Sequence, residues 1–178
     1  MIKKNTDMKI FKNFIFLFLC LFSTSLVAQN LDWEKLREIQ LENKEDVDQF
    51  EKHIPSIIEW LNNHSLTHSD RPNINAIFIF WLEKTSTLTV TLESYVLDYT
   101  KKNPDFFLLF MTGWTIYVLE NPTQKENALK CNLAGVNSIL DFYKKGKDFG
   151  VKKDRKVSKL LKKRNAGKLE EFIAKKSN

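Results

Sequence analysis

The sequence from Asn103 to Lys145 constrains the fold more than any other part of the chain. It opens with an N-cap residue, a proline suited to the first helical position and an acid in the first turn, in Asn103, Pro104 and Asp105. A mostly apolar run continues to Leu119 and stops before Pro122, because proline disfavours helix in the residue that precedes it. We predict a helix from Pro104 that is apolar on nearly all sides and therefore central in the fold.

A second helix is predicted directly after the first. Thr123 and Glu126 match the capping-box pattern, in which a Ser or Thr is followed three residues later by Glu. Apolar residues at helical spacing then continue to Tyr143, and Lys144, Lys145 and Gly146 end the helix. Two helices joined by about three residues pack antiparallel. Gly113 predicts a close approach between helices, since it carries no side chain.

Most of the remaining chain also shows the apolar spacing of helices. The segments are 30–41, 47–61 with a kink or short break at Pro55, 74–82, 93–102, 157–161 and 169–173. Residues 62–73 are polar and rich in turn formers, which predicts an exposed loop. In the segment 74–82 we expect Phe80 to be buried with its neighbours.

One segment has the period of a strand instead. Threonines alternate with Leu88, Val90 and Leu92, but no partner strand is evident elsewhere in the sequence. We therefore expect an extended connector that packs these three side chains on the helices. The prediction for the whole chain is an all-α single domain of about six or seven helices, packed as antiparallel hairpins with one short extended connector.

The first 28 residues have the pattern of a secretory signal. Four lysines precede an apolar run at 14–22, and the small residue Ala28 marks the expected cleavage site. A membrane anchor is the alternative, but the run is shorter than the roughly 20 residues that span a bilayer. Lipid attachment at Cys20 is a further alternative, against which the large side chain of Leu19 argues. We predict an exported protein, periplasmic or extracellular, that is soluble after cleavage of residues 1–28.

Cleavage at that site leaves Cys131 as the remaining cysteine of the sequence. No internal disulfide can then form, so the apolar core alone has to hold the fold. Cys131 lies three residues after Ala128 in a predicted helix, which favours a buried, unreactive thiol.

Charge divides the chain into an acidic body and a basic C-terminal segment. The sequence carries a net charge of +6, but residues 29–143 hold 10 basic and 17 acidic side chains, whereas residues 144–178 hold 14 basic and 4 acidic ones. This asymmetry predicts either an anionic partner for the C-terminal segment or its docking on the acidic body. We divide the chain after the signal into a helical core, 29–146, and basic amphipathic helices, 147–178, packed on or extending from it.

The basic helices supply the candidate residues for an anionic partner. They are Lys152, Lys153, Lys156, Lys159, Lys162, Lys163 and Arg164. With the apolar stripe of Val157, Leu160 and Leu161 they could lie on an anionic membrane surface or meet a protein partner. The alternative is that the stripe packs on the core and the cations face solvent. Nucleic acid is not expected for an exported protein whose only aromatic residue after Lys152 is Phe172.

Sequence motifs for catalysis or cofactor binding are largely missing. His64, His68 and Asp70 are weak candidates for a metal site, in a loop-like segment where solvated side chains are the favoured interpretation. Ser138 follows Gly135 but lacks the spacing and second glycine of a nucleophile elbow. No glycine-rich phosphate loop occurs, and we predict no cofactor and no catalytic residue.

These observations favour a small exported helical protein that acts as a non-enzymatic binding or scaffold module of the cell envelope. The alternatives are a hydrolase-type enzyme with an unrecognised site and a protein that binds anionic membrane surfaces through its basic C-terminal segment. A cleft with converging polar groups would separate the enzyme from the binding module.

Overall fold

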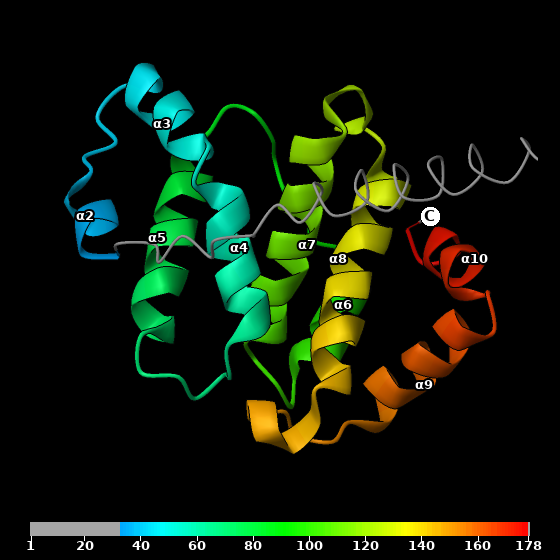
Figure 1. Ribbon diagram of the computed structural model, residues 1–178. Helices are drawn as coiled ribbons and strands as arrows, with labels where there is room; N and C mark the ends of the chain where they lie inside the picture. The colour runs from blue at the N-terminus through cyan, green and yellow to red at the C-terminus, as the bar shows by residue number, and fades with distance from the viewer. Residues whose placement is uncertain (1–32, 178) are drawn as a thin grey trace, which may run out of the picture. The chain divides into compact units, whose positions relative to one another are not determined.

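The helices α7 (Phe106–Glu120) and α8 (Ala128–Lys144) form an antiparallel hairpin at the centre of the structure (Figure 1). The computed structural model describes residues 33–177 of the chain. Buried residues occur in α7 on every side of the helix, from Phe106 to Val118. The prediction of a central helix after Pro104 is confirmed, because an apolar helix of this kind needs neighbours all around it.

Glycines set the distance between these two helices. A Cβ on Gly113 would lie 2.6 Å from the backbone oxygen of Ala134 and 2.6 Å from the Cβ of Ser138. A Cβ on Gly135 would lie 2.6 Å from the Phe110 ring. All three distances are below van der Waals contact, so the two backbones approach as closely as they do only because side chains are absent here. The close approach expected at Gly113 is confirmed.

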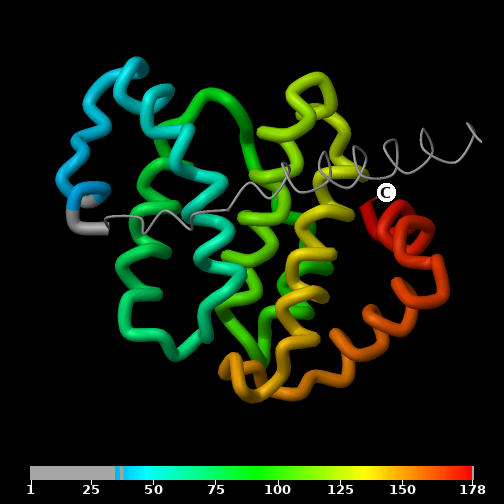
Figure 2. Tube along the Cα trace, in the orientation of Figure 1, coloured from blue at the N-terminus to red at the C-terminus, as the bar shows by residue number. Residues whose placement is uncertain are grey.

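The other helices cover this hairpin. Their bounds are α2 (Trp33–Glu38), α3 (Lys44–Glu51), α4 (Ile54–Asn63), α5 (Arg71–Lys84), α6 (Ser94–Thr100), α9 (Arg155–Asn165) and α10 (Leu169–Ala174), with short 3-10 helices η1 (Pro122–Gln124) and η2 (Gly146–Phe149). Helices α4 and α6 pack on α7, and α9 and α10 pack on α8. Helix α5 packs on α4 and carries α2 and α3. The final segment thus returns alongside α8 (Figure 2).

The all-α fold is confirmed, with no strand among residues 33–177. The helices of residues 33–177 are more numerous than the six or seven predicted, because a break between Glu51 and Ile54 divides the predicted segment 47–61 into α3 and α4. The connector after α5 is not helical. In this connector Leu88 is buried and Val90 is half-buried, but Leu92 is 38% exposed. Two of the three apolar side chains of the connector therefore pack on the helices, rather than all three.

Two predicted helix caps are wrong. Asn103 does not cap α7; its side-chain amide pairs with the backbone of Lys152, accepting from the N–H at 2.7 Å and donating to the oxygen at 2.9 Å. Thr123 lies within η1, and Asn127 caps α8 instead by accepting from the N–H of Lys130. Both predictions rest on the local sequence alone. The structure depends instead on the distant backbone of Lys152 in the first case and on the additional turn η1 in the second.

Arg71 is the main polar group of the core. The segment 62–73, predicted as a loop, is helical at both ends, and Arg71 begins α5 with 1% of its side chain exposed. Its Nη1 donates to the backbone oxygens of Leu61 and His64, both at 2.9 Å, and so closes the carboxyl end of α4. The guanidinium also lies 5.2 Å from the centre of the Phe142 ring. One buried side chain therefore joins α4, α5 and α8.

The predicted signal at residues 1–28 and its Cys20 lie outside the described residues. Within 33–177, no helix is long and apolar enough to cross a membrane. Cys131 is buried and free, as expected, and burial raises the pKa of its thiol. A raised pKa keeps the thiol protonated, which makes it a poor nucleophile.

Gly113→Ala should destabilise the protein by at least about 1 kcal/mol, although alanine favours helix by about that amount. The added methyl group meets a backbone oxygen of α8, which cannot move without separating the helices. Denaturant unfolding followed by circular dichroism measures the change. An increase in stability, as on an open helix face, would show that α7 and α8 do not touch at this point.

Arg71→Met should lower the free energy of unfolding by about 3 kcal/mol, because two carbonyl groups lose a charged donor inside the core. Arg155→Met is the matched control, since Arg155 is exposed at the start of α9. The same unfolding measurement applies to both variants. Equal losses at the two positions would contradict the anchoring role of Arg71.

Candidate functional site

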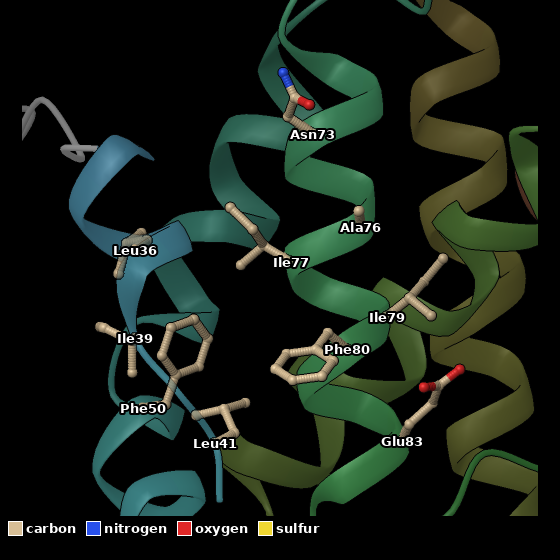
Figure 3. A pocket seen from close by; sticks show the side chains of 10 residues that line it. All are labelled: Leu36, Ile39, Leu41, Phe50, Asn73, Ala76, Ile77, Ile79, Phe80 and Glu83. Atoms are coloured by element: carbon tan, nitrogen blue, oxygen red, sulfur yellow. The ribbon is translucent and has the colours of Figure 1, made fainter.

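An apolar groove of about 650 Å³ runs along α5 (Figure 3). Its floor and walls come from α5, from α3 and from α2 with the segment that follows it. The lining residues are Leu36, Ile39, Leu41, Phe50, Asn73, Ala76, Ile77, Ile79, Phe80 and Glu83. Asn73 and Glu83 are ten residues apart on α5, which makes the groove about 15 Å long, with polar groups at the two ends only.

The groove is where the described residues expose most of their large apolar side chains. Five such side chains are more than a third exposed, and three of them line this groove: Ile39 (37%), Ile79 (38%) and Phe80 (44%). Sequence analysis placed Phe80 in the core, and that expectation was wrong. Helix α5 is apolar around its circumference, but α4 and α3 cover one side of it only, so Ile79 and Phe80 remain on the other.

A second, more polar cleft of about 450 Å³ lies between α7, α8 and the end of α4. Two of its charged side chains are engaged in holding the fold. The Lys145 ammonium donates to the Asn62 backbone oxygen at 2.7 Å, and Asp141 accepts from Arg164 at 2.9 Å. Ser138 Oγ is buried without a hydrogen-bond partner in the described structure, so no base is in contact with it. The groups that line this cleft are not arranged as a nucleophile and base.

The structure brings His64 and His68 together, with ring centres 5.1 Å apart, and Trp60 stacks on His64 at 3.9 Å. The Nδ1 of His64 pairs with the Trp60 backbone oxygen, and that of His68 accepts from the N–H of Asp70. One nitrogen of each ring is thus used in the turn between α4 and α5. No group of three metal-ligating side chains is found in the part of the chain that the structure describes.

The basic C-terminal helices are docked on the core. Val157, Leu160, Leu169 and Ile173 are buried, and Val157 and Ile173 are completely so. Asp154 caps α9 by accepting from the N–H groups of Lys156 and Val157. The hydroxyl of Tyr143 on α8 donates to the backbone oxygen of Asp154 at 3.0 Å. Two of the three residues of the apolar stripe that could have entered a membrane, Val157 and Leu160, are therefore covered by the core, and Leu161 is half-buried.

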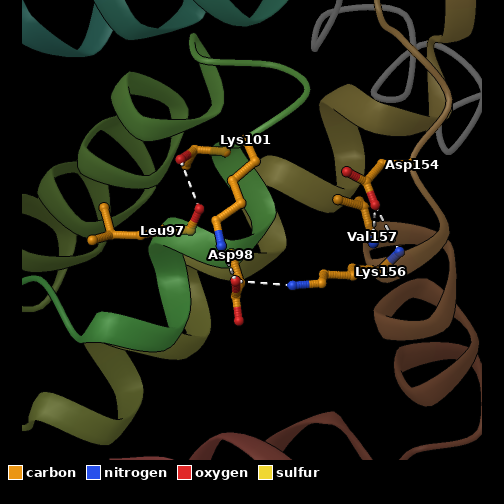
Figure 4. A network of polar contacts seen from close by, with 7 residues as sticks. Leu97, Asp98, Lys101, Asp154, Lys156 and Val157 are labelled. Atoms are coloured by element: carbon orange, nitrogen blue, oxygen red, sulfur yellow. Dashed lines mark hydrogen bonds and ion pairs between the residues drawn. The ribbon is translucent and has the colours of Figure 1, made fainter.

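The predicted anion-binding cations fall into two groups. The first group contacts other residues of the protein. Lys156 pairs with Asp98 at 2.9 Å (Figure 4), and Arg164 pairs with Asp141 at 2.9 Å. The Lys163 ammonium lies 4.7 Å from the centre of the Phe172 ring. The second group is exposed and makes no ion pair with any residue in 33–177. Its members are Lys152, Lys153, Lys159 and Lys162, together with Arg155, which sequence analysis did not select.

Comparison with protein families, characterised proteins and solved structures finds no similar protein. The groove is not among the sites predicted from the sequence, although the sequence contains a signal for it. The run Ile77–Leu82 is apolar at six consecutive positions, more than a helix covered on one side can bury.

Asp98→Asn should lower the melting temperature by a few degrees at most at pH 7, and this difference should shrink to a small fraction as the pH falls to 2. Hydrogen bonds from Lys101 and Lys156 lower the pKa of Asp98 from 3.8 to about 2. A depressed carboxylate pKa stabilises the fold above pH 4, and this stabilisation is lost as the pH falls through the folded-state value. Melting curves of both proteins between pH 7 and pH 2 measure this loss of stabilisation, and a difference that is undiminished at pH 2 would rule out the ion pair as its cause.

Proposed function

We propose that this chain is an exported, non-enzymatic binding module of the cell envelope, and that the groove along α5 binds the alkyl chain of an amphiphilic ligand. The observation that carries the proposal is the concentration of Ile39, Ile79 and Phe80 around one groove. Soluble proteins rarely leave large apolar side chains grouped at the surface unless they bind something there. Export rests on the signal pattern of residues 1–28.

The dimensions of the groove support an alkyl chain as its occupant. A volume of about 650 Å³ lies within the range of small-molecule sites, roughly 300–1,000 Å³. The middle of the groove is formed by aliphatic and aromatic side chains, while Asn73 and Glu83 stand at its ends. A ligand with one long apolar part and a polar end matches this order, because its polar end can stay in water or meet a polar side chain.

The double variant Ile79→Gln, Phe80→Gln should weaken binding of the uncharged apolar dye N-phenylnaphthylamine about tenfold or more. Two partly exposed apolar side chains would no longer be covered by the ligand, and about 1.4 kcal/mol of lost apolar burial already gives a factor of ten. Dye fluorescence measures the affinity, and dodecanol should displace the dye from the unmodified protein.

Leu97→Gln is the matched control, because Leu97 on α6 is 49% exposed but does not line the groove. This variant should bind the dye as the unmodified protein does. Equal weakening by Leu97→Gln would mean that the dye binds exposed apolar residues without selectivity. A large fall in melting temperature for the double variant would show that Ile79 and Phe80 are covered within the protein, and the groove would not be open to a ligand.

A further inference from the structure

We propose that the outer face of α9 is a purely electrostatic docking surface for an anionic lipid membrane. This face consists of Arg155, Lys159 and Lys162, with Lys152 and Lys153 in the loop before the helix. Positions separated by four and three residues share one side of a helix, so the three helical cations stand in a row. The buried residues Val157 and Leu160 occupy the opposite side. The proposal is independent of the groove.

The ion pairs of α9 explain why only one of its sides is available. Lys156 and Arg164 reach Asp98 on α6 and Asp141 on α8, so their charges are already balanced by the acidic body. The five outward cations have no such partner within residues 33–177. Docking of the helix thus separates its cations into a set that attaches it to the core and a set that faces solvent. Like charges held in a row produce a strong local positive potential.

An anionic lipid surface fits this face better than a protein partner does. Four of the five cations are lysines, which act as mobile point charges rather than as rigid forks that select one carboxylate geometry. The apolar residues that would anchor a protein partner are on the buried side of α9. Lipid headgroups need neither a pocket nor a fixed geometry. Each cation near an anionic membrane contributes about a fivefold gain in binding, and screening limits its reach to about 8 Å at physiological ionic strength.

Because Val157 and Leu160 are buried, binding should involve no insertion into the bilayer. The protein should therefore sediment at low salt with vesicles that contain phosphatidylglycerol, but not with vesicles of phosphatidylcholine alone. High salt should release it completely.

Two triple variants separate the face from the net charge. The outer variant is Arg155→Gln, Lys159→Gln, Lys162→Gln, and the inner variant is Lys156→Gln, Lys163→Gln, Arg164→Gln. Both remove three charges from the same helix. The outer variant should weaken vesicle binding about 100-fold and leave the melting temperature unchanged. The inner variant should keep most of the binding but melt at a lower temperature, because it loses the contacts with Asp98, Asp141 and Phe172.

Several results would overturn the proposal. Absence of binding to phosphatidylglycerol vesicles at low salt would do so directly. Equal weakening by the two variants would show that net charge acts rather than this face. Retention on the vesicles at high salt would indicate insertion. A fall in the melting temperature of the outer variant would make its cations structural. Binding to heparin but not to vesicles, lost in the outer variant, would assign the face to a soluble polyanion.

Discussion

The structure depends on covering α7 on all sides. A helix with buried residues from Phe106 to Val118 around its whole circumference is stable only inside a shell of other helices. Helix α8 provides the closest part of this shell, because Gly113 and Gly135 allow the two backbones to meet. Helices α4 and α6 cover other sides. The apolar core therefore has to hold the fold by packing, and the one cysteine among residues 33–177 is a free, buried thiol.

Polar side chains then fix where the shell is attached. Arg71 closes the end of α4 from inside the core, and the Lys145 ammonium bonds to the same end of α4 from the last turn of α8. Asn103 joins the start of the central hairpin to Lys152, which precedes α9. Buried polar groups such as Arg71 and Asn103 have few alternative partners, so they specify one arrangement of helices that apolar contacts alone would not distinguish.

The sequence predicts the helices well where local rules decide them and poorly where distant residues do. The central hairpin follows from an apolar run between two Asn-Pro pairs, and the buried side of α9 from the spacing of Val157 and Leu160. Asn103 has the identity of a helix cap, but its partner is 49 residues away. The division of the α9 cations could not be foreseen either, since Asp98 and Asp141 become neighbours of α9 only in the folded chain. The exposure of Phe80 depends on which helices cover α5, and the residues around Phe80 in the sequence do not contain that information.

The two proposed surfaces follow from one physical argument. Packing explains the side of α5 that meets α4 and the side of α9 that meets α8, and in both helices a side of one predominant chemistry is left over. On α5 that side is apolar and on α9 it is cationic. The two helices lie on either side of the α7–α8 hairpin (Figure 1), so neither surface owes its residues to the other. If both bind, electrostatic docking through α9 would hold the protein where amphiphilic ligands are concentrated, and the groove along α5 would not need to enter the bilayer to receive one.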